Sequence, residues 1–91
     1  MGRDRLTAVR SVVLYSRPDC HLCEEARELL REIEREGGAF HLEEVDIDSD
    51  DALHRRFLER IPVIEVDGRV ITELVPDREE VRATLLQTSG A

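Results

Sequence analysis

The sequence has 91 residues, a length that predicts one domain over 1–91 with its core at about 9–86. Its formal net charge is -8, with 37% charged and 41% hydrophobic residues, a composition typical of globular and not of disordered chains. The negative charge argues against nucleic acids and anionic membrane surfaces as partners, because both would repel it.

No stretch approaches the roughly 20 apolar residues that a membrane-spanning helix needs. Residues 1–10 are charged and lack the apolar core of a signal peptide, so the sequence predicts a cytoplasmic protein, and we expect a monomer. In that reducing compartment the two cysteines, Cys20 and Cys23, are not expected to form a disulfide that serves only to stabilise the fold. Residues 1–7 and 88–91 are expected to be frayed ends.

The first half of the chain predicts a strand, a helix and a second strand. The Val-rich run 9–15 predicts a buried strand that stops before Pro18. Over about 21–36, apolar residues recur every three or four positions, which predicts an amphipathic helix with Glu–Arg pairs three residues apart on its exposed side. Gly37-Gly38 ends it. In the next strand, 40–47, the apolar residues change from one face to the other partway along, which indicates an edge strand or a bulge.

The second half predicts a helix, a β-hairpin and a last helix. Acidic residues cap a helix over about 51–59, in which Phe57 faces inward. The runs 61–66 and 69–72 flank Asp67-Gly68, a strong hairpin signal.

The last helix begins at Asp77 with a variant of the capping box and buries Val81 and Leu85. The element order is therefore β-α-β-α-β-β-α. A parallel β-α-β unit needs a right-handed crossover, and the hairpin must join the same sheet because neither half has enough apolar surface alone. The sequence predicts an α/β fold with one mixed four-stranded sheet flanked by helices.

The segment Cys20-His21-Leu22-Cys23 lies where the first strand gives way to the first helix. There Cys20 falls at a helix N-terminus, where free N–H groups and the helix dipole favour a thiolate. Cys23 follows one turn later on the same side, so the two can close a disulfide with little backbone movement. We predict that Cys20 attacks a substrate disulfide and that Cys23 resolves the mixed disulfide.

The surroundings of the pair leave alternatives. Arg17 and His21 could add positive charge near the sulfur, while Asp19 would oppose it. Half of a zinc site is a second interpretation, but His41 and His54, the histidines outside the motif, are poorly placed, and we expect no metal. Two incidental buried thiols are a third. The βαβ setting favours redox chemistry.

Pro62 follows Ile61 at the head of a strand, where proline interrupts a central strand. A cis bond would explain its place and would turn a loop edge toward the cysteines. A trans proline opening an edge strand is the alternative, because only about 5–6% of X–Pro bonds are cis.

Two motifs carry a resemblance over about 9–86. The segment Tyr15-Ser16-Arg17-Pro18-Asp19-Cys20-His21-Leu22-Cys23 and the later Ile61-Pro62-Val63 with Asp67-Gly68 resemble a glutaredoxin. The resemblance is greatest to the small bacterial glutaredoxin-like proteins of the thioredoxin superfamily, and it implies a thioredoxin-like fold.

The resemblance also implies roles. Cys20 would be the nucleophile, Cys23 the resolving thiol and Pro62 the cis-proline. The backbone of Ile61 would pair with the substrate beside its cysteine. Arg17 falls where glutaredoxins carry a basic residue that favours the thiolate and meets the glycine carboxylate of glutathione.

The sequence departs from the glutaredoxin pattern at two places. His-Leu replaces the usual Pro-Tyr between the cysteines, which leaves the reduction potential open. Where glutaredoxins hold the γ-glutamyl end of glutathione with a Gly-Gly pair, this chain has 72–76, in which Glu73 would face another carboxylate. We therefore expect no required cofactor and regard glutathione as disfavoured.

The sequence predicts a thiol–disulfide oxidoreductase that reduces or exchanges disulfides of proteins or small thiols and is recycled by an unidentified reductant. One alternative is an iron–sulfur carrier, in which Cys20 of two chains and two glutathione thiols hold a cluster. Another is a redox-inactive module that binds a partner. Visible absorbance tests the first alternative, and alkylation rates of the two thiols test the second.

Overall fold

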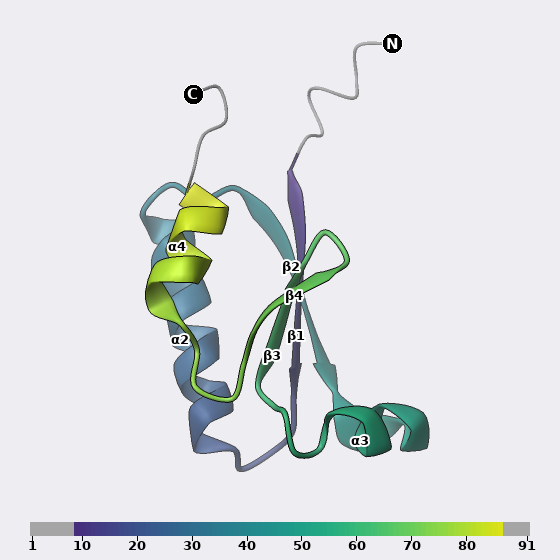
Figure 1. Cartoon of the computed structure of the whole chain (residues 1–91). Helices are drawn as coiled ribbons and strands as arrows, with labels where there is room; N and C mark the ends of the chain where they lie inside the picture. Colours follow the sequence, from purple (N-terminus) through teal and green to yellow (C-terminus); the bar gives the residue numbers. More distant parts are fainter. Residues whose placement is uncertain (1–8, 87–91) are drawn as a thin grey trace, which may run out of the picture.

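The computed structural model describes residues 9–86 of the chain (Figure 1). Its elements in chain order are β1 (Arg10–Ser16), α2 (His21–Arg35), β2 (Phe40–Asp46), the 3₁₀ turn η1 (Ile47–Ser49), α3 (Asp51–Phe57), β3 (Val63–Val66), β4 (Arg69–Glu73) and α4 (Arg78–Leu86). The predicted order of strands and helices is confirmed. The expected frayed ends lie outside the described residues.

The strands form one mixed sheet in the order β2-β1-β3-β4. β1 is parallel to β2 and antiparallel to β3, which pairs with β4 as the predicted hairpin. β2 lies at the edge, as its change of apolar face indicated, and it pairs with β1 without a shift from Phe40 to Asp46. The bulge interpretation of β2 is therefore wrong. The irregularity in the sheet lies in the hairpin, at Ile64 and Glu65.

Several element boundaries differ from the prediction by one or two residues, and two of them have a local reason. Ile47 leaves the strand for η1, because the Asp46 carboxylate accepts the N–H of Asp48 at 2.8 Å and turns the chain. The third strand begins at Val63 and not two residues earlier, because Pro62 has no N–H to donate to a ladder.

The helices α2 and α4 lie on one side of the sheet and α3 on the other (Figure 1), and each side has its own apolar cluster. The larger lies between the sheet and the helices α2 and α4 and includes Leu14, Leu29 and Val81. The smaller lies under α3 and consists of Ile47, Phe57 and Val63, with Tyr15, Leu53 and Ile61 packed against it. Because α3 is short, this smaller cluster is what fixes it to the sheet, and it adjoins the segment that carries Pro62.

Ion pairs connect α2 to the neighbouring elements β2 and α4. Arg27 pairs with Glu44 of β2, and Glu32 pairs with Arg78 of α4. The expected pairs three residues apart, such as Glu24 with Arg27, are not found among residues 9–86, so that prediction is wrong. Arg27 donates hydrogen bonds to both carboxylate oxygens of Glu44 on the neighbouring strand. Such a bidentate pair is stronger than a single contact with a solvent-exposed glutamate on the same helix. Within the described residues, no helix has the length and apolar character to cross a membrane.

The cap of α3 gives a test of the fold. Oδ1 of Asp50 accepts the N–H groups of Ala52 at 2.8 Å and Leu53 at 3.1 Å. We expect Asp50→Ala to lower the free energy of unfolding by about 1 kcal/mol, because two helical N–H groups lose their acceptor. The matched control Asp51→Ala removes the same charge one residue on and should cost less than half as much in urea unfolding. Equal losses would show that charge, and not the cap, supports α3.

Candidate active site

The chain turns sharply between β1 and α2. Pro18 and Asp19 form the turn, with Asp19 at φ 60°, a left-handed conformation that aspartate tolerates better than most residues. Cys20 follows in extended conformation as the N-cap of α2, and its Sγ accepts the N–H of Cys23 at 3.1 Å. A sulfur therefore occupies the place that a Ser or Asp oxygen usually takes at a helix start.

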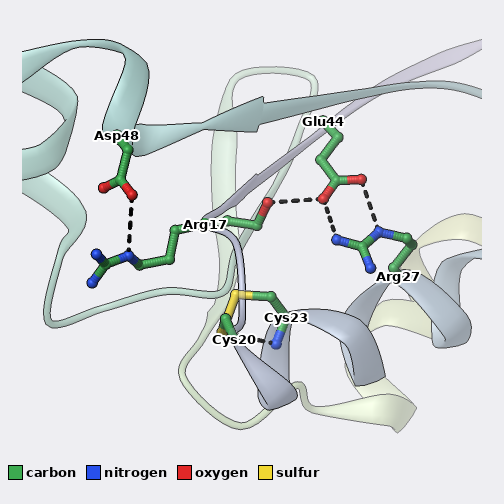
Figure 2. The surroundings of a disulfide bond; sticks show 7 residues. Arg17, Cys20, Cys23, Arg27, Glu44 and Asp48 are labelled. Atoms are coloured by element: carbon green, nitrogen blue, oxygen red, sulfur yellow. Dashed lines mark hydrogen bonds and ion pairs between the residues drawn. A yellow bond between two sulfur atoms is a disulfide. The ribbon is translucent and has the colours of Figure 1, made fainter.

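Cys20 and Cys23 form a disulfide, with their Cα atoms 5.2 Å apart (Figure 2). Cys20 is partly exposed, whereas Cys23 is fully buried on the inner face of α2. Of the two sulfur atoms, that of Cys20 is therefore the one accessible from solvent. The Cys23 N–H is directed at the sulfur of Cys20, a position from which an N–H group favours the thiolate form of a cysteine.

The Ile61–Pro62 bond is cis, so the first of the two interpretations of Pro62 holds. Pairing of Tyr15 with Val63 brings Pro62 to the carboxyl end of β1, where the cysteine loop begins. The N–H of Ile61 donates to the carbonyl of Phe57 at 3.0 Å. Of the backbone groups of Ile61, which was predicted to pair with a substrate, the N–H is therefore engaged within the chain.

Arg17 is not turned toward the sulfur atoms. Its Nε lies 3.4 Å from Oδ2 of Asp48, and Figure 2 shows the side chain extending away from the disulfide to reach that carboxylate. His21, the other expected cation, is exposed and lies with its Nε2 3.3 Å from Oε2 of Glu25, one turn along α2. Within 9–86, no three His, Cys, Asp or Glu side chains are grouped to hold a metal ion.

A polar network that the sequence did not reveal lies beside the disulfide (Figure 2). The Ser16 hydroxyl donates to Glu44 at 2.8 Å, and Arg27 donates to both oxygens of the same carboxylate. The hydrogen bonds from Arg27 hold the pKa of Glu44 below its ordinary value, and Ser16 adds to the effect against partial burial. Arg27 lies four residues after Cys23, on the same face of α2. The register of a parallel β-α-β unit, which sets β2 beside β1, was the one signal that could have found this network.

The opposite flank of the site is formed by the connection from β4 to α4. Glu73 pairs with Arg60, whose carbonyl accepts the N–H of Leu74 at 2.9 Å. Leu74 has φ 60° and is 49% exposed, and Val75 is 68% exposed. The segment thus presents two apolar side chains beside a carboxylate that is already neutralised.

The sheet order, the disulfide at the start of α2 and the cis-proline before β3 together define a thioredoxin-like protein. Residues 11–86 match the family described as glutaredoxin-like domain (DUF836). The chain belongs to this family, which confirms the resemblance drawn from its two motifs.

Solved structures agree with the family assignment. Protein Ne2328 from Nitrosomonas europaea is 32% identical, with a TM-score of 0.73 over 85% of this chain and 92% of that one. Protein XcR50 from X. campestris is 37% identical, with a TM-score of 0.67 over 85% and 97%. The thioredoxin-like protein BC3987 is 25% identical, with a TM-score of 0.56 over 75% and 92%. No curated protein sequence matches the chain.

The Glu44 network predicts a pH dependence of stability. Because the folded-state pKa of Glu44 is lowered, its contribution is present above the unfolded pKa near 4.5 and is lost as the pH falls through the folded value. We expect Glu44→Gln to lower the free energy of unfolding by about 0.5–1 kcal/mol at neutral pH, a small value because the carboxylate is partly exposed. The deficit measured by urea unfolding should shrink as the pH falls below about 4.5. Glu43→Gln on the same strand is the control, and a deficit that persists in acid would contradict the role of the charge.

Proposed function

We propose that the protein is a thiol–disulfide oxidoreductase that works through Cys20 and Cys23. The observation that carries the proposal is the asymmetry of the pair: Cys20 is partly exposed at the start of α2, and Cys23 is buried one turn behind it. The outer sulfur has the access and the hydrogen bond that an attacking thiolate needs. The inner sulfur has the proximity that a resolving thiol needs.

The reaction then runs in two exchanges. The Cys20 thiolate attacks one sulfur of a substrate disulfide, forms a mixed disulfide and releases the other sulfur as a thiolate, which takes up a proton. Cys23 loses its proton and attacks Sγ of Cys20, which releases the second substrate thiol. The substrate gains two electrons, and the Cys20–Cys23 disulfide holds the oxidised state. An unidentified dithiol reductant of the cytoplasm, where we place the reaction, returns the pair to thiols.

We assign the substrate-binding edge to Ile61 and Pro62, with Arg17 at its rim. Pro62 is buried, and its cis bond sets the neighbouring backbone close to the carboxyl end of β1. Because the N–H of Ile61 donates to Phe57, the Ile61 carbonyl is the group that we expect to accept a hydrogen bond from the substrate chain. The edge would therefore hold a peptide by one hydrogen bond and by contact with the apolar ring of Pro62.

We propose that the substrate is a disulfide in a protein and not one in glutathione. Arg60 is paired with Glu73, so its guanidinium is already engaged and is less available to the carboxylate of a γ-glutamyl group. The neighbouring Leu74 and Val75 favour an apolar stretch of polypeptide beside the target cysteine. The protein would act as a monomer, without a required cofactor and without nucleic-acid or membrane partners.

The division of labour between the two thiols is testable by trapping. Cys23→Ser should accumulate a mixed disulfide with its substrate, because nothing resolves the bond at Cys20, whereas Cys20→Ser should form none. Non-reducing gels and mass spectrometry of the adduct give the readout. An adduct on Cys23 in the Cys20→Ser protein, at a similar yield, would overturn the assignment of the attacking thiol.

The preference for protein substrates can be measured by competition between disulfides. The double variant Leu74→Ser and Val75→Ser should lower kcat/KM about fivefold for a peptide disulfide flanked by apolar residues, because about 1 kcal/mol of apolar contact is lost. Reduction of glutathione disulfide should change by less than about twofold. Val70→Ser alters another exposed valine, on β4 near the hairpin, and should affect neither. Equal losses with both substrates would refute the preference.

A further inference from the structure

We propose that Asp48 is a positioning residue, which sets the reactivity of Cys20 by holding the Arg17 guanidinium away from its sulfur. The inference rests on the proposed function, because a thiolate at Cys20 is the species that the reaction uses. It adds a residue on η1 that neither the cysteine motif nor the family match singles out.

Arg17 lies within reach of the sulfur. Arg17 and Cys20 are the two ends of the turn formed by Pro18 and Asp19, and the ends of such a turn lie within about 7 Å between their Cα atoms. An extended arginine side chain spans about the same distance. The guanidinium could therefore stand against Sγ of Cys20, but it is turned to Asp48 instead (Figure 2).

Asp48 is well placed to hold that charge. Its own N–H is bound to the Asp46 carboxylate at 2.8 Å, which fixes the backbone of η1. One carboxylate oxygen, Oδ2, faces Nε of Arg17 at 3.4 Å. The other, Oδ1, faces Nε2 of His54 on α3 at 3.5 Å. Asp48 therefore lies between the guanidinium of Arg17 and the imidazole of His54.

The contact between Arg17 and Asp48 is also loose enough to open. Nε of Arg17 is screened from solvent, yet it makes no hydrogen bond within the described part of the chain. A screened N–H without an acceptor weakens the arrangement that contains it. The two side chains are 40% and 33% exposed, so the attraction between their charges is further reduced by water. The guanidinium thus has a second position available at little cost.

The direction in which the Arg17 side chain points matters for the pKa of the Cys20 thiol, because the guanidinium carries a positive charge. An opposite charge about 4–6 Å from a thiolate lowers the pKa of the thiol. His21 is turned to Glu25, and Asp19 carries the wrong sign, so neither supplies that charge. While Asp48 holds Arg17, the thiolate of Cys20 depends on the start of α2 alone. Loss of the Asp48 charge would release Arg17 toward the sulfur.

The test measures the pKa of Cys20 directly. In a reduced Cys23→Ser background Cys20 is the one thiol of the chain, and its alkylation by iodoacetamide is followed from about pH 4 to 10. Asp48→Asn and the charge-matched control Asp51→Asn are compared, each with Arg17 intact and with Arg17→Gln. Thermal unfolding confirms that each variant is folded, and Asp48→Ser replaces Asp48→Asn should the latter unfold.

We expect Asp48→Asn to alkylate about three- to tenfold faster than Asp51→Asn at about pH 6, with the pH profile displaced to lower pH. Arg17→Gln should abolish this gain, so that Asp48→Asn and Asp51→Asn react at rates within about twofold of each other in the Arg17→Gln background. Equal rates for the two Asn variants, or a gain that survives Arg17→Gln, would overturn the inference. Reduction of a protein disulfide by the wild type is assayed separately, so a failure of the proposed function is distinguishable from a failure here.

Discussion

The hydrogen bond from the N–H of Cys23 to the sulfur of Cys20 is the interaction on which the site depends. It makes the sulfur a part of the helix start, so the secondary structure itself orients the reactive atom. For the bond to form, β1 must end at Ser16 and the chain must turn through Pro18 and Asp19. The parallel pairing of β1 with β2 and the burial of α2 against the sheet hold that geometry in place.

Much of this arrangement could be predicted from local chemistry. The cysteine pair could be placed at a strand–helix junction because a Val-rich run ends, and an apolar stripe of helical period begins, on either side of it. Asp67-Gly68 marks the hairpin, and the Asp77 carboxylate accepts the N–H of Glu80 at 3.1 Å, as a cap should. Such features depend on residues close together in the sequence, which is why the order of elements follows from the sequence alone.

The features that the sequence did not predict join distant parts of the chain. Arg27 was expected to pair along α2 but contacts Glu44 of β2, and Arg17 was expected near the sulfur but contacts Asp48 of η1. A long side chain can reach many acceptors, and its choice depends on the register and tilt of neighbouring elements, which local patterns do not encode. The network at Glu44 and the direction of Arg17 are for this reason visible only in three dimensions.

The separation of the two apolar clusters by the sheet has a mechanical consequence. The larger cluster secures α2 and α4 on one face, while Phe57 and Ile47 secure α3 on the other (Figure 1). The ring of Tyr15 stacks on Phe57, with 4.4 Å between the ring centroids, and β1 thereby contributes to the smaller cluster. Ile61, the residue before Pro62, packs against the same cluster, so the side-chain volume beneath α3 bears on the backbone around Pro62. Substitutions in the smaller cluster can thus alter the segment that we propose to bind the substrate, while the cysteine pair lies against the larger cluster on the other face of the sheet.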